Sequence, residues 1–179
     1  QEYSDSTEIA FLKRIFLPSI DIGYQFPTSS LIESSLRIAT SIEYRFKNIN
    51  DFFIRVNYDT YGAKYRLEDS DNTSNSLDGT VNVSDVFLAP GYRFGDNVYR
   101  LIFAIMPGFK FYEYPELVQT DEAFEILLKS ESLFTTSFLT TLEYYFDRKS
   151  AFTLSLYQNQ VWEDTDFWAD GRTAFGFSV

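Results

Sequence analysis

The sequence contains no cysteine and no histidine among its 179 residues. The missing cysteines exclude disulfide bonds and thiolate metal sites. Long apolar runs are also missing, because no segment approaches the roughly 18 consecutive apolar residues that a membrane-spanning helix needs. Basic residues are too few to balance the acidic ones, and the net charge is −11. A chain of this charge would repel phosphates, so nucleic acid is excluded as a partner.

Aromatic residues are abundant, with 19 Phe and 13 Tyr. They lie in segments where apolar and polar residues alternate, as in LRIATSIEYRF (36–46), which places Leu36, Ile38, Ile42, Tyr44 and Phe46 on one face. This period of two indicates β-strands. It recurs in about eight places, which predicts strands at 20–26, 36–46, 52–58, 86–94, 101–111, 134–146, 152–156 and 173–179.

The predicted connections alternate in length. Three are tight, at 47–51, 95–97 and 147–150, whereas 27–35, 62–80, 113–132 and 161–172 are long and polar. Short turns at one end and long loops at the other are typical of transmembrane barrels, and several predicted strands reach the 9–11 residues that span a bilayer. Aromatic residues at both strand ends fit two interfacial girdles. We therefore predict an all-β protein, an eight-stranded antiparallel up-and-down transmembrane β-barrel with short periplasmic turns and long extracellular loops.

In such a barrel the apolar face of each strand contacts lipid, and the charged face points inward, because a charge facing mid-bilayer costs roughly 2–4 kcal/mol. An eight-stranded barrel has room inside only for its own side chains. The interior is thus predicted to be a network of ion pairs and hydrogen bonds, with no channel. The sequence assigns four acids and six bases to it: Asp21, Arg37, Glu43, Arg45, Arg55, Asp59, Arg93, Arg100, Lys110 and Glu143.

Two prolines fall inside predicted strands. Pro90 and Pro107 cannot donate to a ladder, and a closed barrel has no edge strand to receive them. We expect β-bulges at both, with a local bend at Pro107-Gly108. The alternative fold is a soluble antiparallel barrel or sandwich, lipocalin-like in function, with the apolar face inside.

The whole chain resembles the small eight-stranded outer-membrane barrels of the OmpA/OmpX-like class. VFLAPGYRFGDN (86–97) and TTLEYYFDRKSAFTLSL (140–156) look like segments of the PorT-like barrels common in Bacteroidetes, which are Gram-negative. AFGFSV (174–179) resembles the terminal strand read by the barrel-assembly machinery, with Val179 in place of the usual Phe. The resemblance implies one outer-membrane domain over 1–179, with a periplasmic extension at 1–15. The first residue is Gln1 rather than Met, which fits either a mature chain whose signal peptide has been removed or a trimmed chain.

The same resemblance bears on catalysis. Barrel enzymes of the outer membrane, such as lipid A deacylases, palmitoyltransferases, phospholipases and omptin proteases, all use a histidine, which this chain does not have. We therefore expect no enzyme activity and no cofactor. The expected function is that of a structural, adhesive or accessory outer-membrane component with a plugged interior. The alternative is a subunit of a larger transport or secretion complex. The expected partners are outer-membrane lipid, lipopolysaccharide and other outer-membrane proteins.

The long loops hold most of the acidic surplus. Residues 68–79 have oxygen ligands, but they do not fit a calcium-binding EF-hand, because Ser74 and Thr80 stand where Gly and Glu are needed. No metal site is predicted. In 121–131, Phe124, Leu127 and Leu128 share one face of a predicted short helix. This helix would either cap the barrel mouth or contact a partner. The acids concerned are Glu68, Asp69, Asp71, Asp78, Glu113, Glu116, Asp121, Glu122, Glu125, Glu163, Asp164, Asp166 and Asp170.

Overall fold

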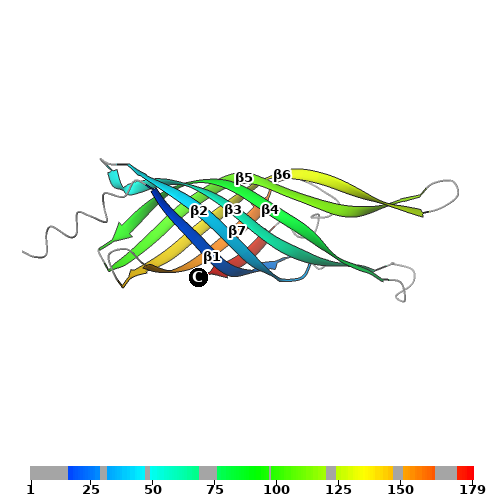
Figure 1. The fold of residues 1–179 in the computed structure, drawn as a ribbon, viewed down its shortest axis with the longest axis horizontal. Helices are drawn as coiled ribbons and strands as arrows, with labels where there is room; N and C mark the ends of the chain where they lie inside the picture. The colour runs from blue at the N-terminus through cyan, green and yellow to red at the C-terminus, as the bar shows by residue number, and fades with distance from the viewer. Residues whose placement is uncertain are drawn as a thin grey trace, which may run out of the picture.

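The computed structural model describes residues 16–28, 32–46, 49–68, 76–96, 98–119, 124–146, 151–163 and 173–179. Eight strands follow one another around a closed barrel, each antiparallel to its neighbours (Figure 1). No helix among these residues is long and apolar enough to cross a membrane. The strands are β1 (Phe16–Pro27), β2 (Ser35–Phe46), β3 (Ile49–Glu68), β4 (Ser76–Gly95), β5 (Tyr99–Gln119), β6 (Phe124–Tyr145), β7 (Ala151–Val161) and β8 (Thr173–Ser178).

The ring closes between the first strand and the last. Residues 23–27 of β1 pair with 174–178 of β8, and the backbones of Ile22 and Val179 exchange two hydrogen bonds of 3.0 Å. β8 is the shortest strand, and its Ser178 lies opposite both Gly23 and Ser155 of β7. The predicted fold, eight antiparallel strands in an up-and-down ring, is confirmed.

The two ends of the barrel differ as the sequence predicts, but the long connections are mostly strand. β2–β3, β4–β5 and β6–β7 are joined by tight turns. At Gly95 the φ angle of 126° requires glycine, and the Asp96 carboxylate accepts the N–H groups of Val98 and Tyr99. At the other end, β3–β4 and β5–β6 continue past the barrel as two long hairpins, which diverge in Figure 1. The predicted loops 62–80 and 113–132 are therefore shorter than expected, because strand pairing reaches Glu68–Ser76 and Gln119–Phe124.

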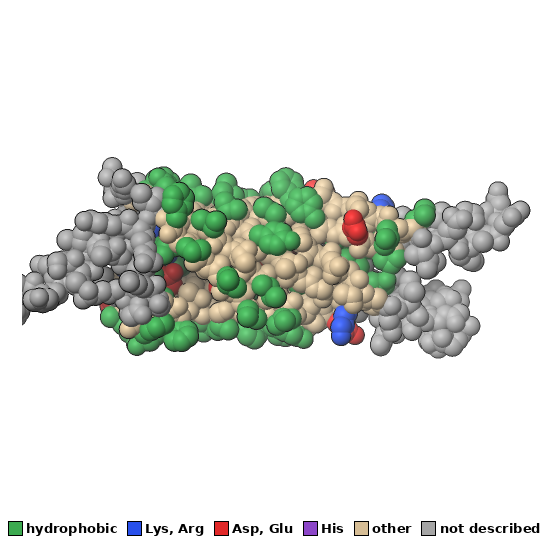
Figure 2. Space-filling view, viewed as in Figure 1, with side chains coloured by type: hydrophobic (Ala, Val, Ile, Leu, Met, Phe, Trp, Pro, Cys, Tyr) green, Lys and Arg blue, Asp and Glu red, His purple; other side chains and the backbone are tan. Residues whose placement is uncertain are grey.

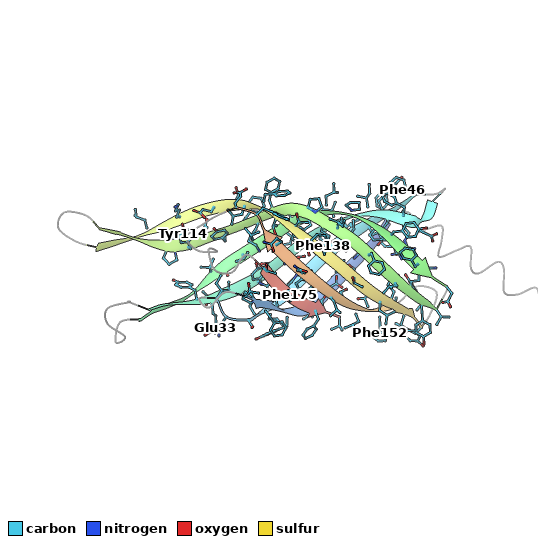
Figure 3. All side chains as sticks on the ribbon, turned by 180° about the vertical axis from the view of Figure 1, so that it is seen from behind. Glu33, Phe46, Tyr114, Phe138, Phe152 and Phe175 are labelled. Carbon is cyan, nitrogen blue, oxygen red and sulfur yellow. The ribbon has the colours of Figure 1, made fainter. Side chains whose placement is uncertain are left out.

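Side chains alternate between an apolar outer wall and a mostly polar interior. Outward residues include Ile20, Ile42 and Leu156, with 57–74% of their surface exposed. Figure 2 shows hydrophobic side chains spread over the barrel wall, with charged ones near its ends. Aromatic rings such as Phe46 and Phe152 lie at the tight-turn end, whereas Phe138 lies on the wall between the ends (Figure 3). The apolar face of this barrel is therefore outside, which is the reverse of a soluble barrel.

The β-bulges expected at Pro90 and Pro107 do not occur. Pro90 pairs in register with Ile54, and Pro107 pairs in register with Thr136. Instead, the ladder between β4 and β5 is interrupted at 88–90 and 105–107, and it resumes in the same register on both sides. The expectation was wrong because a ladder can lose hydrogen bonds without gaining a residue.

Both prolines affect the same seam, which is the line of backbone pairing between β4 and β5. Asp96 donates its N–H to the Tyr99 carbonyl across the β4–β5 turn, at 3.0 Å. Because backbone direction alternates along a strand, even-numbered residues of β4 and odd-numbered residues of β5 direct their N–H groups into this seam. Pro90 and Pro107 occupy two such positions. The missing donors therefore fall between one pair of strands, and the other sides of β4 and β5 keep complete pairing.

Candidate functional site

The interior charges form two groups. In the group nearer the tight turns, Glu43 accepts hydrogen bonds from Arg45 (2.8 Å), Arg55 (2.8 Å) and Arg93 (2.9 Å). Arg93 also contacts Glu143, with 3.1 Å between Nε and Oε2. These residues come from β2, β3, β4 and β6, and the strand period places their side chains inside. Glu43 is therefore the centre of a buried network that joins several strands.

A polar cavity of about 140 Å³ borders this network. Its other walls come from β1 and β7, where Ser19, Asp21 and Thr153 lie beyond the end of β8. Ser19 donates to the Asp21 carboxylate at 3.3 Å, and Tyr145 donates to Glu143 at 2.7 Å. The tight-turn end of the interior is thus hydrophilic, and its cavity is large enough for several water molecules.

The second group lies nearer the hairpins. Arg37 donates to Asp59, with Nε at 3.0 Å from Oδ2, and its guanidinium lies 4.2 Å from the ring centre of Tyr157. Lys110 pairs with Asp85 at 2.9 Å. Asp85 is fully buried and is a fifth interior acid that the sequence prediction missed, because the predicted strand began at Val86. Its even spacing from Phe87, Ala89, Gly91 and Arg93 would have revealed it.

Aromatic rings fill much of the remaining interior. A β-carbon on Gly91 would collide with the ring of Phe53, and one on Gly176 would collide with the ring of Tyr157. These glycines therefore provide the space that the rings occupy. The buried apolar cluster around them comprises Phe53, Phe87, Ala89, Ile102, Ala104, Met106, Leu139 and Tyr157.

The bases of the two hairpins hold a second buried cluster, formed by Ile32, Tyr61, Ala63, Tyr65, Val81, Val83, Tyr112, Tyr114, Leu133 and Val161. Tyr112 donates to Glu131 at 2.5 Å, Tyr114 donates to it at 3.1 Å, and Lys129 lies 3.3 Å away. Partial burial acts to raise the pKa of Glu131, but these contacts outweigh it and lower the pKa below its ordinary value. This carboxylate is therefore held in its charged form.

The predicted interior residues lie where the strand alternation places them, with two qualifications. Arg100 lies at the tight-turn rim, where its Nε donates to the Asp96 carbonyl at 2.9 Å. Asp21 lies at the cavity and is only partly buried. The Arg55 side chain is 12% exposed. The other predicted residues are buried, namely Arg37, Glu43, Arg45, Asp59, Arg93, Lys110 and Glu143.

The predicted helix around Phe124 is wrong. β6 begins at Phe124, so Leu127 and Leu128 are consecutive strand residues on opposite faces of the hairpin, with 50% and 74% exposure. The helical spacing was misread because strand pairing with β5 decides this segment. The side chain of Phe124 lies outside the described residues, as do those of the predicted loop acids except Glu113 and Glu163.

These features define a closed eight-stranded antiparallel barrel with an apolar outer wall and a charged interior, the fold of the small outer-membrane barrels. Among solved structures, the chain is similar to Neisserial surface protein A, with a TM-score of 0.61 and 15% sequence identity over 92% of this chain and 94% of that chain.

The N-terminal β-barrel domain of Pseudomonas aeruginosa OprF gives a TM-score of 0.48 at 14% identity, over 92% of this chain and 95% of that chain. The attachment invasion locus protein Ail of Yersinia pestis gives 0.47 at 14% identity, over 90% and 93% of the two chains. No protein-family model and no curated protein matches the sequence.

Proposed function

We propose that the protein is a non-catalytic outer-membrane barrel that holds its two long hairpins outside the cell for recognition. The observation that carries this proposal is the inverted distribution of side chains. Residues such as Ile20, Ile42 and Leu156 are exposed on the outer wall, whereas Arg37 and Glu43 are buried. In water this arrangement would expose apolar surface around the whole barrel, and in a bilayer it buries that surface in lipid.

The wall residues define the lipid contact. On β6, outward residues from Phe134 to Tyr144 are apolar or aromatic, with Thr136 and Thr140 as exceptions, and the outward positions beyond Phe134 are Ser132 and Ser130. On a tilted strand, the eleven residues from Phe134 to Tyr144 correspond to the apolar band of about 25 Å in such barrels. Outer-membrane lipid and lipopolysaccharide would cover this band, and the hairpins would lie beyond it. The likeness of the chain to PorT-like barrels of Bacteroidetes remains part of this proposal.

The interior supports a plugged barrel. Phe53, Phe87 and Met106 are fully buried in it, and its buried carboxylates contact arginine or lysine. A carboxylate held in an ion pair is a poor general base, which fits the expectation of no catalysis. A lipocalin-like carrier needs an apolar interior pocket, and the charged interior argues against that alternative.

Three measurements test the proposal together. We expect the protein to need detergent for purification, to change its electrophoretic mobility on boiling, and to give no stable conductance in planar bilayers. A monodisperse, detergent-free monomer would refute the membrane placement. A persistent ohmic pore would refute the plug and leave the membrane placement intact.

A second candidate function is membership of a larger outer-membrane complex. It is favoured by an apolar groove of about 580 Å³ on the outer wall, lined by Pro90, Gly91 and Ile105 near the interrupted seam. A partner would fill this groove. Ile105→Trp should then abolish co-purification from gently solubilised membranes, whereas Ile42→Trp, a control at a similarly exposed wall position, should not. Equal behaviour of the two variants would reject this function.

A further inference from the structure

The seam between β4 and β5 separates before either hairpin ends. Its pairing stops at Val83–Tyr112. β4 continues to pair with β3 as far as Ser76, and β5 continues to pair with β6 as far as Gln119. Within the described residues, 76–82 and 113–119 therefore have a strand neighbour on one side only, and these edges face the divergence of the hairpins (Figure 1).

A cleft of about 690 Å³ occupies this divergence. Thr80 and Asn82 line it from β4, whereas Phe111, Glu113 and Leu128 line it from the other hairpin. A chain that entered the cleft would therefore meet a strand edge on one side and apolar and acidic side chains on the other.

The two edges are not equivalent. The registers of β3–β4 and β5–β6 are uninterrupted here, so the alternation of N–H direction continues along both strands. Thr80 and Asn82 direct their backbone N–H and C=O groups into the cleft. On β5, one of the positions that direct N–H groups into the cleft is Pro115, which has no N–H. Proline is a common means of blocking an edge strand. The β5 edge is blocked in this way, whereas the β4 edge is open as far as the structure describes the chain.

The charge of the hairpins determines what kind of chain can bind in the cleft. Residues 113–131 contain six acids and one lysine, and residues 64–82 contain four acids and two bases. A second copy of this chain would bring the same negative charge to the edge and would be repelled. An extended segment rich in lysine or arginine would gain both backbone hydrogen bonds and charge attraction.

We propose that the open edge of β4 at residues 76–82 binds an extended, positively charged segment of another protein by β-strand addition. The proposal rests on the proposed function for its place outside the cell. The binding itself is measurable on detergent-solubilised protein, so its failure and the failure of the membrane placement are separate results.

The probe is a nine-residue synthetic peptide of alternating lysine and valine. Two comparison peptides are used. One carries glutamate in place of lysine, and the other is the lysine peptide with N-methyl groups on alternate residues, which remove the backbone N–H donors along one edge. We expect the lysine peptide to bind saturably, to shift the amide NMR signals of Thr80 and Asn82, and to slow their hydrogen exchange. The acidic and N-methylated peptides should each bind at least tenfold more weakly.

Two variants test the edge itself. Thr80→Pro removes an N–H that points into the cleft and takes no part in pairing with β3. Ile126→Pro is the matched control, because Ile126 is an even-numbered β6 residue whose N–H points away from β5. Boiling-dependent mobility reports whether each variant folds. Thr80→Pro should weaken binding of the lysine peptide at least tenfold, and Ile126→Pro should leave it unchanged.

Several results would overturn the proposal. Equal binding of the lysine and glutamate peptides would remove the charge argument. Equal binding of the N-methylated peptide would remove strand addition, and this comparison uses the unaltered protein, so it stands even if Thr80→Pro fails to fold. Slowed exchange at Thr80 that depends on protein concentration without peptide would assign the edge to a second copy of the chain.

Discussion

Glu43 offers the sharpest test of the interior network. The residue is 2% exposed, and its carboxylate accepts hydrogen bonds from Arg45, Arg55 and Arg93. Glu43→Gln keeps the size of the side chain and removes its charge, which leaves three guanidinium groups with Glu143 as their remaining acidic partner in this group of ion pairs. Breaking a buried ion pair typically costs ~3–5 kcal/mol. The neighbouring polar cavity offers some compensation, so we expect a loss near the lower end, about 3 kcal/mol.

The assay is urea unfolding in detergent micelles, followed by tryptophan fluorescence and by electrophoresis without boiling. Glu143→Gln should cost less than Glu43→Gln, because Glu143 contacts a single arginine, Arg93. Glu113→Gln is the control, since Glu113 lies exposed on a hairpin and accepts from Ser130. If Glu43→Gln lies within about 0.5 kcal/mol of the unaltered protein, as ordinary surface substitutions do, the network does not stabilise the barrel.

Three further predictions concern the rings, the hairpins and the charge of the mouth. Gly91→Ala should destabilise the barrel by about 1–3 kcal/mol through overpacking, and a second change, Phe53→Leu, should recover part of the loss in the same urea assay. The lowered pKa of Glu131 stabilises the fold above the ordinary glutamate range, and this contribution should disappear as pH falls through the lowered pKa. Carboxyl NMR titration should show a midpoint below that of an ordinary glutamate, and Tyr112→Phe should raise it; an unchanged midpoint would contradict the hydrogen-bond explanation. Limited proteolysis of reconstituted vesicles should cut the chain in the two long hairpins and spare the barrel strands, whereas cleavage at the tight turns from the same side would contradict the assigned orientation.

The strand alternation carried most of the fold prediction. The segment 36–46 gave the correct inward and outward faces because a period of two is decided locally, residue by residue. The same argument predicts that Glu43, Arg45 and Arg93 lie inside, and all three are buried. Ion-pair partners follow less directly, since Arg93 and Glu143 are 50 residues apart and meet only through the register of three strands.

The hairpins show where local patterns fail. Residues 113–132 are polar and acidic, which is typical of a loop, but pairing between β5 and β6 extends them as strands. The spacing of Leu127 and Leu128 fitted a helix equally well, and hydrogen bonds to the neighbouring strand decide between the two. The effect of Pro90 and Pro107 also depends on the neighbouring strands, because the register decides which neighbour loses a hydrogen bond.

If the barrel lies in the membrane as proposed, the length and acidity of the two hairpins also bear on how it inserts. A barrel inserted from the periplasm must move this end across the bilayer, including the six acids between residues 113 and 131. Each charge meets an energetic barrier in the hydrocarbon core, whereas the three tight turns never have to enter it. After insertion, the same barrier opposes return. In the proposed orientation, the acidic residues would therefore oppose reversal of the barrel, independently of any partner that the hairpins bind.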